Sequence, residues 1–194
     1  MKKHSYAIPL VIVLIVMAGA ISLGSCLGDR HDAKMAASAD SLYCRLDADS
    51  VPFMADVSRD ARFMIRTTDS TTYFCDIIYP ATSAHLYCTF RLTDTTQIAR
   101  LHYEAQRIVS FHSRVASSIE AIPVRNRFGV EGTLYELRGD VATPYQLALS
   151  DEATFFFNAS LYFDDGSHAD AVPGLVGAMK HDIDRLVYSF APRR

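Results

Sequence analysis

The stretch YELRGDVATPYQLALSDEATFFFNASLYF, residues 135–163, decides the fold that we expect for this chain. It contains three runs in which apolar and polar residues alternate, separated by two short polar breaks, Gly139-Asp140 and Ser150-Asp151. Alternation with a period of two is typical of a strand that buries one face. Because connections this short join antiparallel neighbours, the stretch predicts an antiparallel meander.

The last of these runs, TFFFNASLYF, carries aromatic side chains on both of its faces. Phe155 and Phe157 point to one side of the predicted strand, whereas Phe156 and Tyr162 point to the other. Such a strand either lies at the centre of a sheet, covered on both sides, or exposes Phe156 and Tyr162 as a patch that binds a partner. We interpret it as a central, covered strand.

Further elements flank the meander on both sides. Runs rich in β-forming residues predict the strands SVPFMADV (50–57), ARFMIRT (61–67), TYFCDIIY (72–79), AHLYCTFRL (84–92) and SIEAIPV (118–124). Apolar residues spaced by threes and fours predict one helix from Ile98 to Val115, with Asp94 as the N-cap of a capping box. The same spacing predicts a second helix from about Asp170 to Phe190. The chain thus has a group of strands followed by a helix, and then a second group of strands followed by a helix. This order favours a single α+β domain in which an antiparallel β-sheet is layered with two main helices.

The N-terminus has the layout of a bacterial lipoprotein signal. Lys2 and Lys3 precede an almost unbroken aliphatic run that ends at Ala20. The sequence LGSC that follows, residues 23–26, resembles the lipobox, where a peptidase cuts before the cysteine and acyl chains such as palmitate are attached. We therefore predict Cys26 as the lipid attachment residue. The alternative is an ordinary signal peptide, or an uncleaved anchor, with an incidental cysteine.

The predicted cleavage divides the chain into three parts. Residues 1–25 are the signal peptide, residues 26–41 a lipidated tether of small and polar residues, and residues 42–194 the folded domain. Cleavage leaves 169 of the 194 residues and removes two lysines, so 17 Lys plus Arg face 22 Asp plus Glu, a net charge of −5. Nucleic-acid binding usually needs a clustered basic patch. No nucleic-acid partner is therefore expected.

The polar residues indicate no catalytic or metal site. The chain lacks the Gly-x-Ser-x-Gly elbow of serine hydrolases. His102 and His112 lie ten residues apart on the predicted helix, and His85 stands alone in a strand, so none has the short spacing of metal ligands. The sequence Asp164-Asp165-Gly166 lacks the further carboxylates of a calcium loop. We therefore expect no catalytic residue, no metal and no cofactor.

Cys75 and Cys88 are the candidates for a disulfide. The chain turns near Ala81-Thr82, and a hairpin centred there places the two cysteines directly opposite each other. Opposed residues in a non-hydrogen-bonded pair have Cα atoms about 4.5 Å apart, at the short end of the range that a disulfide accepts. Export would place them in an oxidising compartment. The alternative is a pair of buried, reduced thiols.

Several segments of the chain resemble the gliding-motility lipoprotein family GldD. They are the opening stretch at 135–163, KHDIDRLVYSF (180–190), FCDIIYP (74–80), LYCTF (86–90) and the lipobox. The resemblance runs from Asp47 to Phe190. Two features depart from the family pattern, since the chain ends in SFAPRR instead of an aromatic and basic finish, and no cysteine accompanies Pro52-Phe53.

The resemblance implies an envelope lipoprotein that supports gliding motility and, in the same bacteria, the type IX secretion machinery. It implies no enzyme. The expected partners are the membrane that holds the lipid on Cys26, expected to be the outer membrane, and other proteins of an envelope complex. The family's cysteine near the first strand also implies a rival disulfide between Cys44 and Cys75.

A second class of function stays open, in which the lipoprotein captures a small ligand such as an envelope lipid or glycan between sheet and helix. A pocket on the order of several hundred Å³ favours ligand binding. A filled interior favours a non-catalytic interaction module.

Overall fold

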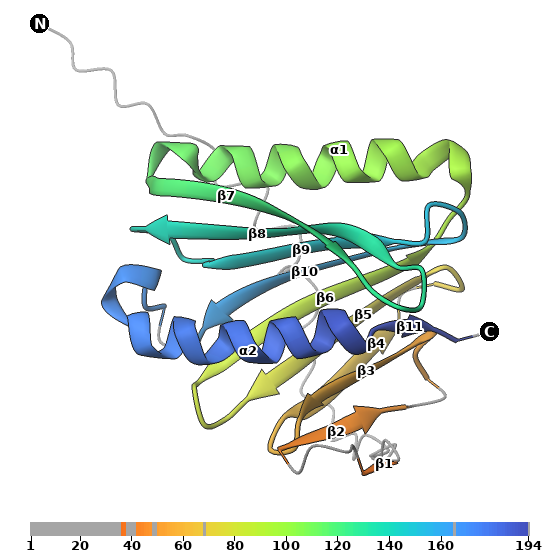
Figure 1. Ribbon diagram of the computed structural model, residues 1–194, viewed down its shortest axis with the longest axis horizontal. Coiled ribbons are helices and arrows are strands. Elements are labelled where there is room, and N and C mark those ends of the chain that lie inside the picture. The colour runs from red at the N-terminus through yellow and green to blue at the C-terminus, as the bar shows by residue number, and fades with distance from the viewer. Residues whose placement is uncertain (1–35, 38–41, 48–49, 68, 165, 194) are drawn as a thin grey trace, which may run out of the picture. The chain divides into compact units, whose positions relative to one another are not determined.

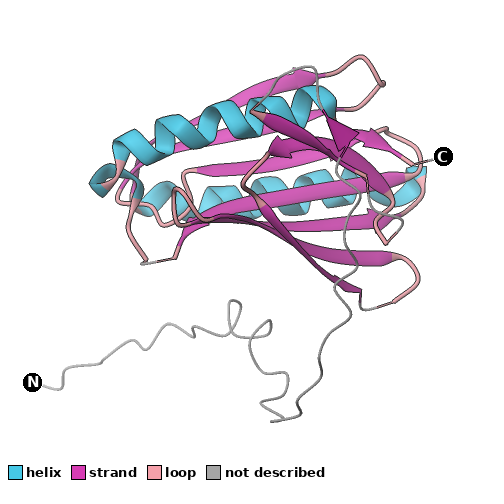
Figure 2. Cartoon of the chain, turned by 90° about the horizontal axis from the view of Figure 1, so that it is seen from below, coloured by secondary structure: helices cyan, strands magenta, loops and turns pink. Residues whose placement is uncertain are grey.

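The computed structural model describes residues 36–37, 42–47, 50–67, 69–164 and 166–193, which belong to one compact unit spanning Ala33–Arg194. In chain order its elements are β1 (Ala36–Ala37), β2 (Tyr43–Leu46), β3 (Phe53–Ser58), β4 (Arg62–Thr67), β5 (Thr72–Tyr79), β6 (Ala84–Leu92), α1 (Thr95–Phe111), η2 (His112–Arg114), β7 (Ala116–Arg125), β8 (Glu131–Gly139), β9 (Tyr145–Ser150), β10 (Phe155–Phe163), η3 (Ala169–Ala171), α2 (Pro173–Ser189) and β11 (Ala191–Pro192). Both main helices run lengthwise along the strands (Figure 2). The fold is the α+β domain that the sequence predicts.

Seven strands form one large antiparallel sheet in the order β4-β5-β6-β10-β9-β8-β7. On one side of the sheet, β4, β5 and β6 pair in chain order, and on the other side β7, β8, β9 and β10 do the same. The two groups meet where β6 pairs with β10 and Phe90 lies opposite Phe157. The aromatic run therefore forms a central strand, as its sequence predicts.

Four short strands form a second sheet in the order β1-β2-β3-β11. Of these, only β3 corresponds to a strand predicted from the sequence. The other three have two to four residues each, which is too short for a periodic pattern to reveal. Ala36 and Ala37, in the segment interpreted as a tether, pair with Arg45 and Cys44 of β2.

The main core lies between α2, the small sheet and one face of the large sheet, which we call the front face. In Figure 1, α2 crosses in front of the large sheet. Five fully buried phenylalanines pack together there: Phe53, Phe90, Phe155, Phe157 and Phe190. The ring centroids of Phe53 and Phe190 lie 5.0 Å apart, and those of Phe157 and Phe190 lie 4.7 Å apart. Since burying one such side chain is worth about 1.5–3 kcal/mol, this cluster fixes α2 and the small sheet on the large sheet.

A buried carboxylate also ties the small sheet to α2. Asp56 on β3 is 4% exposed. Its carboxylate lies 2.7 Å from Nε of Arg45 and 2.9 Å from a terminal guanidinium nitrogen of Arg185. The backbone N–H of Asp56 donates to Oγ of Ser189 at 2.7 Å. Two arginines thus compensate a charge that would be costly to bury alone.

The helix α1 covers part of the opposite face of the large sheet, the rear face. Asp94 caps the helix as predicted, because its carboxylate accepts a hydrogen bond from the backbone N–H of Thr96 at 2.9 Å. Leu101 packs against Ala148 and Phe156 from the sheet.

The end of α1 differs from the sequence prediction. The helix ends at Phe111, and a 3₁₀ turn follows, so its predicted continuation to Val115 is wrong. Ile108, expected on the buried side, is 53% exposed, whereas Val109 is buried. Each residue of an α-helix turns about 100° around the axis, so Val109 lies only about 20° from the buried Ile98, whereas Ile108 lies about 80° away on the other side. The helix therefore turns Val109 toward the sheet in place of Ile108.

Candidate functional site

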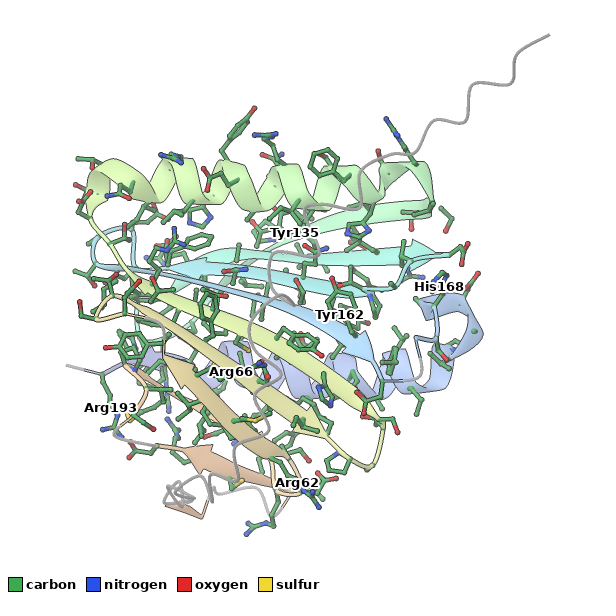
Figure 3. The ribbon with its side chains drawn as sticks, turned by 180° about the vertical axis from the view of Figure 1, so that it is seen from behind. Arg62, Arg66, Tyr135, Tyr162, His168 and Arg193 are labelled. Carbon is green, nitrogen blue, oxygen red and sulfur yellow. The ribbon has the colours of Figure 1, made fainter. Side chains whose placement is uncertain are left out.

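The rear face of the large sheet is covered unevenly. The helix α1 contacts β9 and β10, whereas neither described helix covers β4, β5 and β6 on this side (Figure 3). Four large side chains there are exposed: Met64 by 46%, Phe74 by 37%, Tyr87 by 45% and Tyr162 by 38%. Apolar patches of this kind usually mark an interaction surface. We call the surface the open face; its residues are Arg62, Met64, Arg66, Phe74, Asp76, His85, Tyr87 and Tyr162.

The strand register brings the open face together from four strands. Asp76 on β5 lies opposite Met64 on β4 and opposite Tyr87 on β6. The rings of Tyr87 and Tyr162 meet edge to face, with centroids 5.7 Å apart. Figure 3 shows Arg66 and Tyr162 on this same side of the sheet. Cross-strand neighbours of this kind lie within contact distance, so the open face is one continuous surface.

Arginine side chains set the charge of the open face. Asp76 is 5% exposed and accepts a hydrogen bond from the guanidinium of Arg66, so its negative charge is compensated. His85 pairs with Asp164, with 2.9 Å between Nε2 and Oδ1. Arg62 is exposed and pairs with no carboxylate among the described residues. The open face therefore presents a cation that no described carboxylate neutralises, on a chain whose acidic residues outnumber its basic ones.

The two tyrosines of the open face keep their protons. Burial, and then the charges of Asp76 and Asp164, raise the pKa of Tyr87 above its ordinary value. Burial and the neighbouring Tyr87 raise the pKa of Tyr162. Both hydroxyls are therefore neutral hydrogen-bonding groups on large apolar rings. This combination is typical of side chains at protein interfaces.

Two histidines outside the open face each pair with a single carboxylate. Nε2 of His102 lies 3.3 Å from Oε1 of Glu152, and Nδ1 of His168 hydrogen-bonds to Asp140. His112 stands at the end of α1, where burial lowers its pKa. In the part of the chain that the structure describes, no group of three or more His, Cys, Asp or Glu side chains is placed to hold a metal ion.

The hairpin of β5 and β6 has the register that the sequence predicts, because Cys75 lies directly opposite Cys88. Both side chains are almost fully buried and both thiols are free. Burial, and then contact with Cys75, raise the pKa of Cys88 well above its ordinary value. Cys44 lies on β2 in the small sheet, where its Sγ donates to the carbonyl of Val57 at 3.5 Å. The disulfide between Cys75 and Cys88 stays a prediction.

Cys26, the predicted lipid attachment residue, lies outside the described residues, so its modification also stays a prediction. Among the residues described, no helix is long and apolar enough to span a bilayer.

Two hollows lie near the sheet. A groove of about 330 Å³ lies between β8 and the start of α2, and its lining includes Arg138, Tyr145, Asp170 and Gly177. A cavity of about 30 Å³ lies beneath α1, beside Tyr135. The cavity has room for about one water molecule. The larger hollow is thus a surface groove at one end of α2, and the phenylalanine cluster fills the space between sheet and helix.

Residues 34–191 match the sequence profile of the family described as gliding motility lipoprotein GldD. The chain belongs to the GldD family. The match covers every described helix and strand except the last residue of β11. No curated protein matches the sequence significantly. Among solved structures, the chain is similar to the solution structure of cyanobacterial PsbP (CyanoP) from Synechocystis sp. PCC 6803, with 12% identity and a TM-score of 0.43, over 88% of this chain and 98% of that chain.

In this GldD-family chain, the interpretation of the aromatic strand as covered on both sides holds for Phe156 but is wrong for Tyr162, which is 38% exposed on the open face. The sequence analysis does not predict Met64, Phe74 or Arg66 as contact residues. The alternation in ARFMIRT and TYFCDIIY assigns these three side chains to one face of their strands. It does not say that this face lacks a covering helix, because that depends on which strands α1 reaches.

Proposed function

We propose that this GldD-family protein is a lipid-anchored, non-catalytic component of the gliding-motility or type IX secretion-associated machinery, and that its open face binds a protein partner. The observation that carries the proposal is the group of four exposed large side chains on adjacent strands. Family membership supports the link to motility.

The partner on the open face should present apolar side chains flanked by acidic ones. Met64, Phe74, Tyr87 and Tyr162 offer apolar contact, while Arg62 and Arg66 lie at the β4 edge of the patch. Aromatic and arginine side chains are enriched at the centres of protein interfaces. A carboxylate on the partner could pair with Arg62, which has no carboxylate partner among the described residues.

Site-specific photo-crosslinking in living cells tests this assignment. A benzophenone side chain at Tyr87 should form an adduct with a protein of the motility or secretion machinery. The matched control is Tyr103 on α1, which is 62% exposed but lies outside the open face. The same adduct from both positions, or no adduct from Tyr87, would contradict the proposed surface.

Complementation of a deletion strain gives a functional test. The double variant Phe74→Ser/Tyr87→Ser should accumulate normally but fail to restore gliding or secretion, because it removes apolar contact area without opening the core. Tyr103→Ser should restore both. Full activity of the double variant would show that the open face is not used.

We propose that Cys26 carries the lipid and holds the protein in the outer membrane. The lipobox and the preceding aliphatic run support this assignment. Two or more acyl chains anchor a protein stably, whereas one chain binds only marginally. Mass spectrometry of the protein from its own membranes should show a lipidated N-terminal Cys26. A Cys26→Ala protein that still begins at residue 26 and stays membrane-bound would contradict it.

The second candidate function, binding of a small lipid or glycan, rests on the groove between β8 and α2. Its volume of about 330 Å³ falls within the range of small-molecule sites. Gly177 lines the groove, and a Cβ placed there meets no atom within 4 Å, so Gly177→Phe should fill the groove without a clash. Gly174→Phe is the control, since Gly174 has similar space and does not line the groove. If Gly177→Phe alone abolished function, ligand binding would replace our proposal.

A further inference from the structure

A rigid tip of aromatic and basic side chains stands at one end of the domain. It comprises Arg125, Arg127 and Phe128 from the hairpin between β7 and β8, together with Tyr188 from the last turn of α2. The guanidinium carbon of Arg127 lies 4.8 Å from the centroid of the Phe128 ring and 5.7 Å from that of Tyr188. Phe128 is 39% exposed and Tyr188 is 56% exposed. We call this group the aromatic-basic tip.

Asn126 holds the tip in place. Its side-chain amide donates to the carbonyls of Val187 and Phe190, both at 2.8 Å. Its Oδ1 accepts from the backbone N–H of Phe128 at 2.9 Å. Because these bonds join the hairpin to the end of α2, the aromatic-basic tip is fixed before it meets any partner.

The tip lies at the end of the domain where the predicted tether joins it. Ala36 pairs with Arg45, and β1 is antiparallel to β2, so the chain enters beside the end of β2 that leads to Asp47. Arg193 pairs with Asp47, which places the C-terminal segment at the same end. Figure 1 shows the β7–β8 hairpin loop beside β11 and the C-terminus.

We propose that the aromatic-basic tip contacts the phosphate headgroups of the membrane in which the protein is anchored. The inference rests on the proposed lipid at Cys26, ten residues before Ala36. Ten residues span at most about 35 Å, so the anchor keeps this end of the domain near the bilayer. Tyr188 has the amphipathic ring that is enriched at membrane interfaces. Phe128 has an apolar ring of the kind that enters the boundary between headgroups and acyl chains. Arginine binds phosphate oxygens through two parallel hydrogen bonds.

The charges around the tip fit this assignment. Arg127 pairs with no carboxylate in the described part of the chain, whereas Arg125 lies 3.3 Å from Glu131. The loop with Asp151 and Glu152 lies at the same end of the sheet, because Ser150 is opposite Glu131. The acidic loop would be repelled by anionic headgroups, so the domain tilts toward α2 and the contact is confined to the tip.

A weak contact between the tip and the headgroups is sufficient to orient the domain, because the lipid on Cys26 already holds the protein at the membrane. A short tether makes the second contact intramolecular and gives it a high effective concentration. In this orientation, the end of the sheet that carries the β7–β8 hairpin points toward the bilayer. The open face then points sideways and is accessible to proteins of the envelope.

Tryptophan fluorescence tests the inference, because the chain contains no tryptophan. Phe128→Trp is prepared as full-length lipidated protein and reconstituted into phosphatidylethanolamine–phosphatidylglycerol vesicles that contain brominated lipid. Tyr162→Trp is the matched control, since Tyr162 is 38% exposed, close to the 39% of Phe128, but lies near the opposite strand ends. The indole of Phe128→Trp should be quenched and its emission shifted to the blue, whereas that of Tyr162→Trp should change little.

Charge reversal sharpens the result. Adding Arg127→Glu to Phe128→Trp should reduce quenching at least about threefold, because it places a carboxylate against the headgroups. Arg62→Glu in the same background should leave quenching unchanged. Equal quenching of the Phe128→Trp and Tyr162→Trp proteins, or no quenching of Phe128→Trp in protein that floats with the vesicles, overturns the inference alone. Protein that carries no lipid and does not float overturns the proposed anchor, and the inference with it.

Discussion

The two halves of the rear face are similar in chemistry but differ in their cover. Phe156 lies under α1, 5% exposed, with its ring edge-on to His102 at 5.0 Å between centroids. Phe74, on the half that no described helix covers, is 37% exposed. A single strand crosses the boundary, since Tyr162 lies six residues after Phe156 on β10 and is 38% exposed. Alternation along a strand determines which side chains share a face, but the neighbouring helix determines whether they become core or surface.

The largest expected effect comes from truncating one phenylalanine in each half. Phe156→Ala should lower the free energy of unfolding by about 3–5 kcal/mol, because it leaves a cavity under α1. Phe74→Ala should lower it by about 1 kcal/mol or less, since solvent already reaches that ring. Chemical denaturation of the purified mature protein measures both. Similar losses for the two variants would mean that something also covers the open face in the free protein.

The second prediction concerns a covalent link in the β5–β6 hairpin, whose two cysteines are buried in the main core on the side of the sheet opposite the open face. Peptide mapping without reduction, on protein taken from the envelope under thiol blocking, should find Cys75 joined to Cys88. A bridge that closes a loop of this length should raise the free energy of unfolding by about 3 kcal/mol, because it restricts the unfolded chain. Reductant should therefore lower the free energy of unfolding by that amount.

Cys44→Ala is the control for the disulfide, because it removes the remaining thiol of the domain and should leave the effect of reductant unchanged. Free Cys75 and Cys88, or a link from either one to Cys44, would show that the predicted pairing is wrong.

A smaller effect should separate two arginines on the same side of β4. Arg66→Met leaves the buried carboxylate of Asp76 without its cation and should cost about 1–2 kcal/mol, reduced by the exposure of Arg66. Arg62→Met should change the free energy of unfolding by less than about 0.5 kcal/mol. Denaturant titration of both variants measures the difference. Equal costs would mean that Arg66 does not hold the Asp76 charge.

The smallest effect concerns the cap of the covering helix and its pH dependence. Hydrogen bonds from Thr96 lower the pKa of Asp94 below its ordinary 3.8. The folded state therefore favours the ionised carboxylate of Asp94. The stability that this cap gives to the folded state is present above pH 3.8 and is lost as the pH falls through the lowered pKa. Asp94→Ala should speed amide hydrogen exchange in α1 at neutral pH, and the difference from the unsubstituted protein should vanish in acid.

Asp69→Ala is the matched control, because Asp69 accepts a hydrogen bond from the backbone N–H of Thr71 in the β4–β5 loop and its pKa is also lowered. It should leave exchange in α1 unchanged. Faster α1 exchange in Asp69→Ala would show that the covered and open halves are coupled through the sheet.

Local chemistry explains which parts of the fold the sequence predicts. Alternation identifies the strands of the large sheet, the turn near Ala81-Thr82 sets the opposition of Cys75 and Cys88, and Asp94 marks the start of α1. Each of these features depends on residues that are close in the chain. The small sheet escapes prediction because its outer strands are too short to show a period.

The candidate site is less predictable because it depends on distant residues. The sequence assigns Phe74 to one side of its strand but does not show that α1 stops over β10 and leaves β5 uncovered. The aromatic-basic tip requires Arg127 to meet Tyr188, which comes from an element far along the chain. Nothing in the local pattern around either residue predicts that contact.

The pairing of β6 with β10 also has a consequence for how the protein matures. Phe90 and Phe157 face each other across that pair although 67 positions separate them in the chain. Pairings between such distant segments form slowly. If the chain is exported as proposed above, with its N-terminus first, β6 emerges long before β10, so the edge of β6 stays unpaired in the meantime, a state prone to aggregation. We therefore expect translocation to be almost complete before the large sheet closes, and the emerging first half to need a chaperone until its partner strand arrives.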